Sequence, residues 1–179
     1  MPNLYQSLVG DDWETLDPSV RSFLSAMPSN ATALFAVSNG NWRPAQFFAR
    51  MLGLPRAGKG VHVHVRRYMK GTLEVWERTF PDVKLVSRQW QEDGLLAEHM
   101  GIVVCRFRLR VVDGALLFQH HSTLFAVMGL RIHIPKAIAP TIHAYCEPAT
   151  EPQSTFTQVS IWLPLVRIVL TYAGIVTQR

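Results

Sequence analysis

The chain has 179 residues, of which 48% are hydrophobic, and a formal net charge of +5. A chain of this length buries enough apolar surface to fold without a disulfide or metal staple, so we expect one domain over residues 1–179. The two cysteines lack the paired spacing of a zinc site, no 18-residue uncharged stretch occurs, and the first residues lack a signal-peptide pattern. These features predict a cytoplasmic protein that does not span a membrane.

The first 52 residues predict helices on either side of a short strand. Residues 3–27 carry apolar side chains at helical spacing, and Asp17-Pro18 supplies an N-cap followed by a proline in the first helical position. Residues 33–37 predict a strand. Residues 43–52 predict a further helix whose apolar stripe is expected in the core, namely Phe47, Phe48, Met51 and Leu52.

From Gly60 onward the apolar residues alternate with polar ones, and no helical pattern separates the segments, which predicts antiparallel strands. The strands are expected at residues 61–65, 73–80, 83–91, 95–99, 103–111, 116–125, 142–147, 155–163 and 167–176. Asp113-Gly114 predicts a tight hairpin turn. Residues 126–140 contain two prolines and are expected to form an apolar loop or short helix that covers a cavity.

These elements predict an α+β fold that is mainly antiparallel β. We expect a curled sheet or barrel with N-terminal helices and an apolar cavity. A barrel of this size can hold one small ligand.

Basic residues concentrate in two strands, and both groups are expected on a solvated face. A protein that binds single-stranded nucleic acid would place exposed aromatic residues among such cations to stack bases, whereas here the aromatics alternate onto the opposite face. Nucleic acid is therefore an unlikely partner. The basic groups are Arg66, Arg67 and Lys70, and Arg106, Arg108 and Arg110.

No metal or cofactor is expected. His62 and His64 share one face of a strand and could bind a metal, but no third ligand is marked, and Arg66 and Tyr68 on the same face indicate solvent. Phosphate-binding loops, dinucleotide-binding fingerprints and the serine-hydrolase pentapeptide are missing from the sequence.

Two ionisable residues share strand faces with apolar side chains. Arg78 alternates with Trp76 and Phe80, and Glu98 lies on the short strand 95–99. A buried charge must be paired, so a mutual salt bridge is one interpretation. In the other, Arg78 stabilises a developing oxyanion while Glu98 moves a proton. The protonation state of Glu98 stays open, because burial raises its pKa and a neighbouring arginine lowers it.

The remaining candidates are histidines and aromatic residues. His120 and His121 are adjacent on one strand, so only one can face inward, and the alternation of their neighbours leaves the choice open. His133, in the 126–140 segment, could act as an acid or base at a pocket mouth. The expected ligand-binding side chains are Trp76, Phe80, Phe107, Phe118 and Tyr172.

Several short motifs follow one another along nearly the whole chain: Leu4 to Leu8, Leu52 to Pro55, Trp76 to Phe80, Ser87, Glu98 to Gly101, Ile134-Pro135 with Ala139-Pro140, Leu163 to Leu165, and Tyr172 to Gly174. In this order they resemble the DUF4166 family, a domain of unknown function often found C-terminal to saccharopine-dehydrogenase-like domains. The resemblance implies a fold unit, with pocket positions at Trp76, Arg78, Phe80 and Glu98, rather than a reaction.

The leading hypothesis is a domain that encloses a hydrophobic small molecule, such as a polyketide- or terpenoid-like intermediate, and acts as a cofactor-independent isomerase or cyclase. The alternative is a ligand carrier or accessory subunit that docks on an oxidoreductase through the strand face of Arg106, Arg108 and Arg110. Both hypotheses allow a homodimer.

Overall fold

The computed structural model describes residues 2–51, 53–127, 129–164 and 167–178. Its helical elements are α1 (Leu4–Val9), the 3-10 helix η1 (Gly10–Thr15), α2 (Pro18–Ser25) and α3 (Arg43–Met51). Its strands are β1 (Ser29–Asn39), β2 (Gly58–Lys70), β3 (Leu73–Thr79), β4 (Lys84–Glu92), β5 (Leu95–Met100), β6 (Val103–Val112), β7 (Ala115–Val127), β8 (Leu130–His133), β9 (Thr141–Pro148), β10 (Ser154–Leu163) and β11 (Arg167–Gln178).

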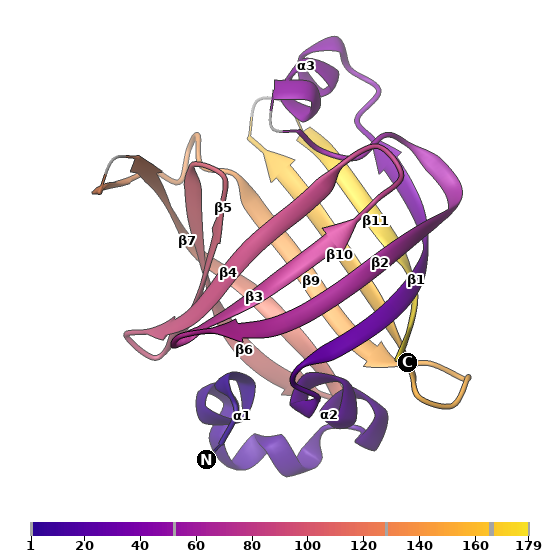
Figure 1. The fold of residues 1–179 in the computed structure, drawn as a ribbon. Helices are drawn as coiled ribbons and strands as arrows, with labels where there is room; N and C mark the ends of the chain where they lie inside the picture. The colour runs from indigo at the N-terminus through magenta and orange to yellow at the C-terminus, as the bar shows by residue number, and fades with distance from the viewer. Residues whose placement is uncertain (1, 52, 128, 165–166, 179) are drawn as a thin grey trace.

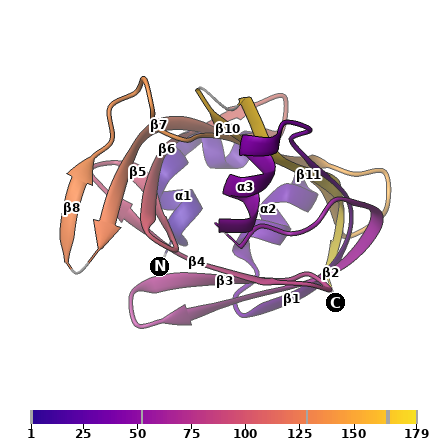
Figure 2. The same cartoon turned by 90° about the horizontal axis from the view of Figure 1, so that it is seen from above.

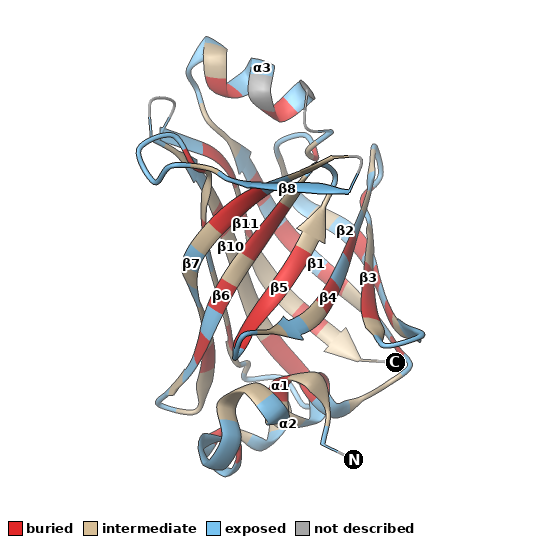
Figure 3. Cartoon of the chain, turned by 90° about the vertical axis from the view of Figure 1, so that its left-hand side faces the viewer, coloured by how far each residue is buried: buried red, intermediate tan, exposed pale blue. Residues whose placement is uncertain are grey.

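Ten of the described strands form a closed antiparallel barrel in the order β6-β5-β4-β3-β2-β1-β11-β10-β9-β7, and the pairing of β7 with β6 closes it. Helices α1 and α2 cover one end of the barrel, the N-terminal end, while α3 lies over the other, the α3 end (Figure 1). Figure 2 looks down onto α3, and Figure 3 shows buried and exposed residues alternating along the strands. The predicted fold, a mainly antiparallel α+β domain with an apolar interior, is confirmed.

The tight turns follow the sequence pattern. Asp113 and Gly114 have φ angles of 49° and 79°, the left-handed pair that a two-residue hairpin requires. Their hairpin joins β6 to β7, and Ala115 pairs with Val112 across it. A second tight turn, after Lys70, joins β2 to β3, with Gly71 at a φ of 62°.

The prediction of a loop or short helix over residues 126–140 is wrong for its first half. Residues 130–133 form β8, which pairs with the end of β7. The hairpin is held to the outer wall of the barrel, where Arg131 bonds to Glu92 at 2.6 Å and lies over the Trp90 ring. An apolar cluster on the outer wall supports it, made of Ala97, Val104 and Leu124 with Trp90 and Ala126.

The predicted core stripe of the helix at 43–52 is also corrected. Helix α3 buries the small residues Ala45 and Ala49 against Val169 of β11, whereas Phe47 is 64% exposed. Small side chains let the helix lie close to the strand, which turns the larger residue outward. The side chains of Phe48 and Met51, and residue Leu52, lie outside the described part of the chain.

Local sequence signals begin the N-terminal helices. The Asn3 side chain accepts a hydrogen bond from the Gln6 N–H, and Asp17 accepts one from the Ser19 N–H, so each helix has a side-chain N-cap. The apolar faces then close the barrel end, because these side chains belong to the same core cluster as the strands: Tyr5, Trp13, Leu16, Val20, Phe23 and Leu24.

A fully buried ion pair joins the helices to the barrel. Arg67 of β2 and Glu74 of β3 lie 2.8 Å apart, with side chains 0% and 3% exposed. The Arg67 guanidinium also donates to the backbone carbonyls of Phe23 and Leu24, two of the last carbonyls of α2. Such carbonyls have no partner within their own helix, so Arg67 caps α2 from the barrel wall.

Side chains of α1 and β3 complete the hydrogen bonding of this ion pair. The Glu74 Oε1 atom accepts bonds from the Arg67 guanidinium, from Trp76 Nε1 at 2.8 Å and from the Tyr5 hydroxyl at 3.2 Å. Tyr5 also donates to Gln89 Oε1 at 2.6 Å. A buried charge pair contributes to stability only when its remaining bonding capacity is satisfied, and here it is well satisfied.

We expect the substitution Glu74→Gln to lower the free energy of unfolding by about 3–5 kcal/mol, because it leaves the Arg67 charge buried without a counter-ion. Urea unfolding measures the loss. The matched control is Glu77→Gln on the outward face of the same strand, where the partner Lys84 is half exposed; its cost is below about 1 kcal/mol. Equal costs would contradict the structural role assigned to Glu74.

Candidate functional site

The barrel interior is arranged in layers along its axis. The buried Arg67–Glu74 group lies against the N-terminal helices. Because β3 runs from that end toward the α3 end, its inward residues Trp76 and Arg78 are followed by Phe80, directly after the strand. Arg78 therefore lies between the structural ion pair and the aromatic layer next to the α3 end.

Arg78 and Glu98 form a second ion pair inside the barrel. Their closest atoms are 3.6 Å apart, and the side chains are 14% and 10% exposed. Arg78 donates to the Ser87 hydroxyl at 3.2 Å and lies over the Trp76 ring, 5.0 Å from its centroid. Burial alone would lower the pKa of Arg78, but the nearby Tyr172 and Glu98 oxygens raise it, so the guanidinium stays charged.

The Glu98 carboxylate is less well bonded than that of Glu74. Its Oε1 atom is buried and lies 3.6 Å from the Arg78 guanidinium, just beyond hydrogen-bond distance, and no closer donor lies beside it among the described residues. Its register neighbours are Gln89 on β4 and Cys105 on β6. A carboxylate held close to a cation but short of hydrogen bonds keeps acceptor capacity for another molecule.

An aromatic layer lies beyond this pair. The Phe35, Phe80 and Tyr172 rings contact one another, with centroids 5.1 to 6.4 Å apart. Burial raises the pKa of Tyr172, with the Arg78 charge acting against the shift and the Glu98 charge adding to it. Tyr172 is therefore a neutral hydroxyl group at physiological pH.

The choice between His120 and His121 is settled by a β-bulge. Arg106 pairs with Ser122 and Phe107 pairs with His120, so His121 is the extra residue of β7. His120 faces the interior, where its ring lies 5.9 Å from that of Phe107. Thr123, three residues further on, also faces inward because the bulge shifts the alternation; its hydroxyl lies 3.3 Å from His120 Nε2.

His120 is a neutral base in the folded protein. Burial, together with the neighbouring His143 and His121, lowers its pKa to about 4. Its Nδ1 atom is buried without a hydrogen-bond partner among the described residues. Phe107 and Phe118 pack beside it, with ring centroids 6.2 Å apart.

The structure brings most of the predicted site residues into one interior, with one exception. His133 lies on β8 outside the barrel, is exposed, and has its Nε2 3.5 Å from Arg106 of the outer wall. It is not grouped with Arg78 and Glu98.

Arg106 itself is held by Glu92, Asp93 and Ser122, so of the predicted basic strand face only Arg108 and Arg110 remain exposed.

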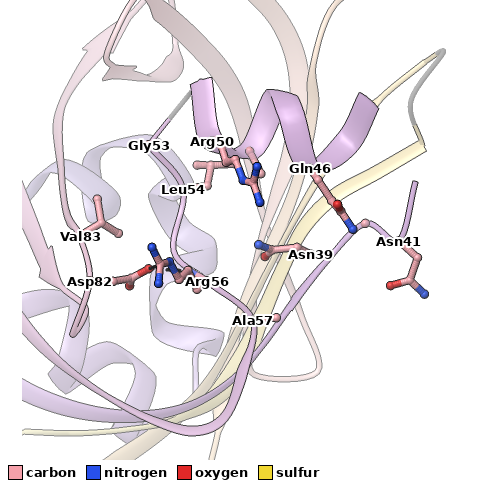
Figure 4. A pocket seen from close by; sticks show the side chains of 12 residues that line it. Asn39, Asn41, Gln46, Arg50, Gly53, Leu54, Arg56, Ala57, Asp82 and Val83 are labelled. Carbon is pink, nitrogen blue, oxygen red and sulfur yellow. Dashed lines mark hydrogen bonds and ion pairs between the residues drawn. The ribbon is translucent and has the colours of Figure 1, made fainter. Parts of the chain in front are cut away.

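A pocket of about 830 Å³ opens at the α3 end (Figure 4). Asn39, Gln46, Arg50 and Arg56 supply polar groups to it. Leu54 and Val83 belong both to the pocket lining and to the side chains packed on the core. None of the predicted site residues lines this pocket, which lies at the barrel end beyond the aromatic layer.

Three interior residues that the sequence analysis did not select belong to the buried network: Tyr5, Glu74 and Gln89. Arg67, predicted on a solvated face, is instead fully buried. The signal was present, because Arg67 continues the alternation of Val63 and Val65, and Glu74 that of Trp76 and Arg78. Among the described residues no cluster of His, Cys, Asp or Glu side chains could hold a metal ion.

The model of a family described as "Domain of unknown function (DUF4166)" matches residues 18–175. The chain belongs to the DUF4166 family. The matched residues include those of both interior ion pairs. No curated protein and no solved structure matches the chain. In the part of the chain that is described, no helix is long and apolar enough to cross a membrane.

We expect the low pKa of His120 to make folding stability depend on pH. An unfolded histidine titrates near pH 6.5, so between about pH 6.5 and 4 the unfolded chain binds a proton that the folded chain does not. The free energy of unfolding therefore falls as the pH falls through this range, by about 1–2 kcal/mol when the partial exposure of the ring is allowed for.

Urea unfolding at several pH values measures this effect. The His120→Gln variant should lose less stability than the natural protein over the same pH range. His121→Gln, on the exposed neighbour, serves as the matched control and should retain the natural slope. Identical slopes for all three proteins would show that His120 is not buried in its neutral form.

Proposed function

We propose that this protein binds a hydrophobic small molecule in its barrel and converts it as a cofactor-independent isomerase or cyclase. The substrate class we favour is a polyketide- or terpenoid-like intermediate. The observation that carries the proposal is the Arg78–Glu98 pair, in which a buried carboxylate oxygen has the guanidinium at 3.6 Å and no closer hydrogen-bond donor among the described residues.

The comparison with the first ion pair supports this assignment. The Arg67 guanidinium is bonded by Glu74 and by two helix carbonyls, and the Glu74 Oε1 atom also accepts from Tyr5 and Trp76, as a structural pair requires. Arg78 and Glu98 are further apart and have fewer hydrogen-bonding partners. Incompletely satisfied ionisable groups in an apolar interior are typical of functional sites.

The chemistry needs a base and an oxyanion donor. The Glu98 carboxylate takes a proton from a carbon next to a substrate carbonyl; the C–H electron pair forms a C=C bond, and the carbonyl π pair moves onto the oxygen. Arg78 N–H and the neutral Tyr172 O–H donate to that oxygen. In an isomerase Glu98 returns the proton to another carbon; in a cyclase the enolate carbon attacks a second carbonyl, which takes up the proton. Neither reaction oxidises or reduces the substrate.

Access is proposed from the α3 end. Leu54 and Val83 form the apolar side of the pocket and pack on the core below it. A ligand would pass from the pocket through the layer of Phe35, Phe80 and Tyr172 to reach Arg78 and Glu98. Phe107, Phe118 and Trp76 would then supply the apolar contacts on the other strands.

The carrier alternative has the same interior but no turnover. Its proposed docking face is reduced to Arg108 and Arg110, because Arg106 is neutralised by Glu92 and Asp93. We therefore rank it second. Cytoplasmic location and a homodimer stay predictions from the sequence.

The first experiment is native mass spectrometry of the purified protein, followed by denaturing extraction and identification of any bound molecule. We expect a stoichiometric apolar ligand. A folded protein that is empty, and that takes up no apolar compound from an extract of its host, would contradict ligand binding. A ligand that is retained without change over many hours favours the carrier.

With the extracted compound as substrate, we expect Glu98→Gln to lower the turnover rate by about 10²–10⁴-fold while the ligand still binds, because a general base is lost and the shape is kept. Glu77→Gln makes the same chemical change on the outer wall and should retain full activity. Full turnover by Glu98→Gln would exclude Glu98 as the base, and loss of folding comparable to that of Glu74→Gln would assign Glu98 a structural role.

Access through the α3 end is tested separately by Gln46→Trp. Gln46 is exposed on α3 and lines the pocket, so a large side chain there fills the pocket without displacing core residues. We expect uptake of the ligand to weaken about tenfold, or ~1.4 kcal/mol, relative to Gln46→Ala. Unchanged uptake would show that the ligand enters elsewhere.

A further inference from the structure

The two ends of the barrel carry opposite charge. Because all barrel strands are antiparallel, the connections alternate between the ends. The connections at the α3 end, within the described residues 40–51, 53–57, 80–83, 101–102, 129–140 and 164, contain five basic residues and one acidic residue: Arg43, Arg50, Arg56, Arg131 and Lys136, with Asp82. Arg56 is paired with Asp82 and Arg131 with Glu92, so the basic excess rests on Arg43, Arg50 and Lys136.

The N-terminal end has the reverse balance. Residues 2–28 and the connections 71–72, 93–94, 113–114 and 149–153 contain seven acidic residues and one basic residue: Asp11, Asp12, Glu14, Asp17, Asp93, Asp113 and Glu151, with Arg21. The exposed Lys70 adds one cation at the end of β2 beside the 71–72 turn. The modest net charge of the chain thus conceals a strong charge separation along the barrel axis. In an electric field from an anionic surface, the molecule would turn its α3 end toward that surface.

The α3 end also exposes most of the large apolar side chains that reach solvent. Among the described residues thirteen such side chains are exposed, and nine lie at this end: Trp42, Phe47, Ile102, Phe125, Leu130, Ile132, Ile138, Trp162 and Ile168. They come from α3, from the β5–β6 turn, from the β7–β8 hairpin and the segment after it, and from the ends of β10 and β11. The two exposed tryptophans are both among them.

Helix α3 shows how the exposure arises. The helix packs on the barrel with Ala45 and Ala49, which leaves Trp42 and Phe47 56% and 64% exposed beside Arg43 and Arg50. Aromatic side chains together with arginine are the composition of segments that lie in the interface of a membrane. Tryptophan in particular favours the level of the lipid headgroups.

We propose that the α3 end is a docking surface for an anionic lipid bilayer, on which the protein lies peripherally with its pocket facing the membrane. The basic residues fit the negative surface potential of anionic lipids, and the exposed apolar residues fit the boundary between headgroups and acyl chains. The exposed cations of the α3 end are spread around the barrel rim rather than along one wall; they include Arg43, Lys59, Lys136 and Arg167.

Vesicle co-sedimentation tests the proposal with the full chain. The probes are vesicles of phosphatidylcholine alone and of phosphatidylcholine mixed with phosphatidylglycerol. We expect binding to the mixed vesicles, weak binding to the neutral ones, and a loss of binding as salt screens the attraction. Brominated lipids should quench tryptophan fluorescence on binding, and Trp42→Phe should reduce the quenching.

Paired variants separate the α3 end from net charge. Arg43→Glu with Lys136→Glu should weaken binding to the anionic vesicles roughly fivefold or more for each residue. Arg108→Glu with Arg110→Glu makes the same change in net charge on the barrel wall and should have much less effect. Trp42→Ala with Phe47→Ala should weaken binding, whereas Leu34→Ala with Met69→Ala, two exposed apolar residues of the wall, should not.

Three outcomes would overturn the proposal. The first is no binding to the anionic vesicles at low salt. The second is equal loss of binding in the end and wall variants, which would indicate only the net charge. The third is that the protein binds single-stranded DNA or an acidic protein but not the vesicles, and that the α3-end variants abolish this binding. None of these outcomes depends on turnover, so the proposed function is tested independently.

Discussion

The architecture depends on the buried ion pair between Arg67 and Glu74. Placing an arginine in an apolar interior is costly, and the cost is offset because the guanidinium bonds Glu74 and also caps the last carbonyls of α2. Tyr5 of α1 and Trp76 of β3 complete the bonding of the carboxylate. The same group therefore joins two strands to two helices and closes one end of the barrel, and the pocket lies at the other, the α3 end.

The role of the second ion pair, Arg78–Glu98, is best understood by comparison with the first. Arg78 follows Trp76 along β3, one step further from the helices, in an interior that is already closed below it. Ser87 and the Trp76 ring position its guanidinium, while Glu98 retains an unbonded oxygen. A barrel that completed both pairs would gain stability but would have no reactive group inside. The incomplete bonding at Glu98 is the basis of the proposal that this interior transfers a proton within an apolar ligand.

Features of this structure that depend on neighbours in the chain can be predicted from the sequence, whereas features that depend on distant residues cannot. Hairpin turns such as Asp113-Gly114, helix caps such as Asp17-Pro18, and the shared face of Trp76, Arg78 and Phe80 depend on neighbours in the chain, and these predictions are confirmed. The bulge at His121 depends on the pairing of β6 with β7 and reverses the alternation beyond it, so periodicity alone could not choose between His120 and His121. The exposure of Phe47 depends on how closely Ala45 and Ala49 approach β11. Periodicity identifies a helical face but not the partner that covers it.

The sequence by itself determined the fold class, the positions of most strands and the presence of ionisable residues on apolar faces, because alternation and turn chemistry are local properties. The tertiary structure decided which of those residues meet. It separated a saturated pair, Arg67–Glu74, from an unsaturated one, Arg78–Glu98, and it placed His133 on the outer wall. It also gathered basic and exposed apolar residues from distant connections at one end of the barrel, a property that exists only when the strands are closed into a cylinder and their connections alternate between its ends.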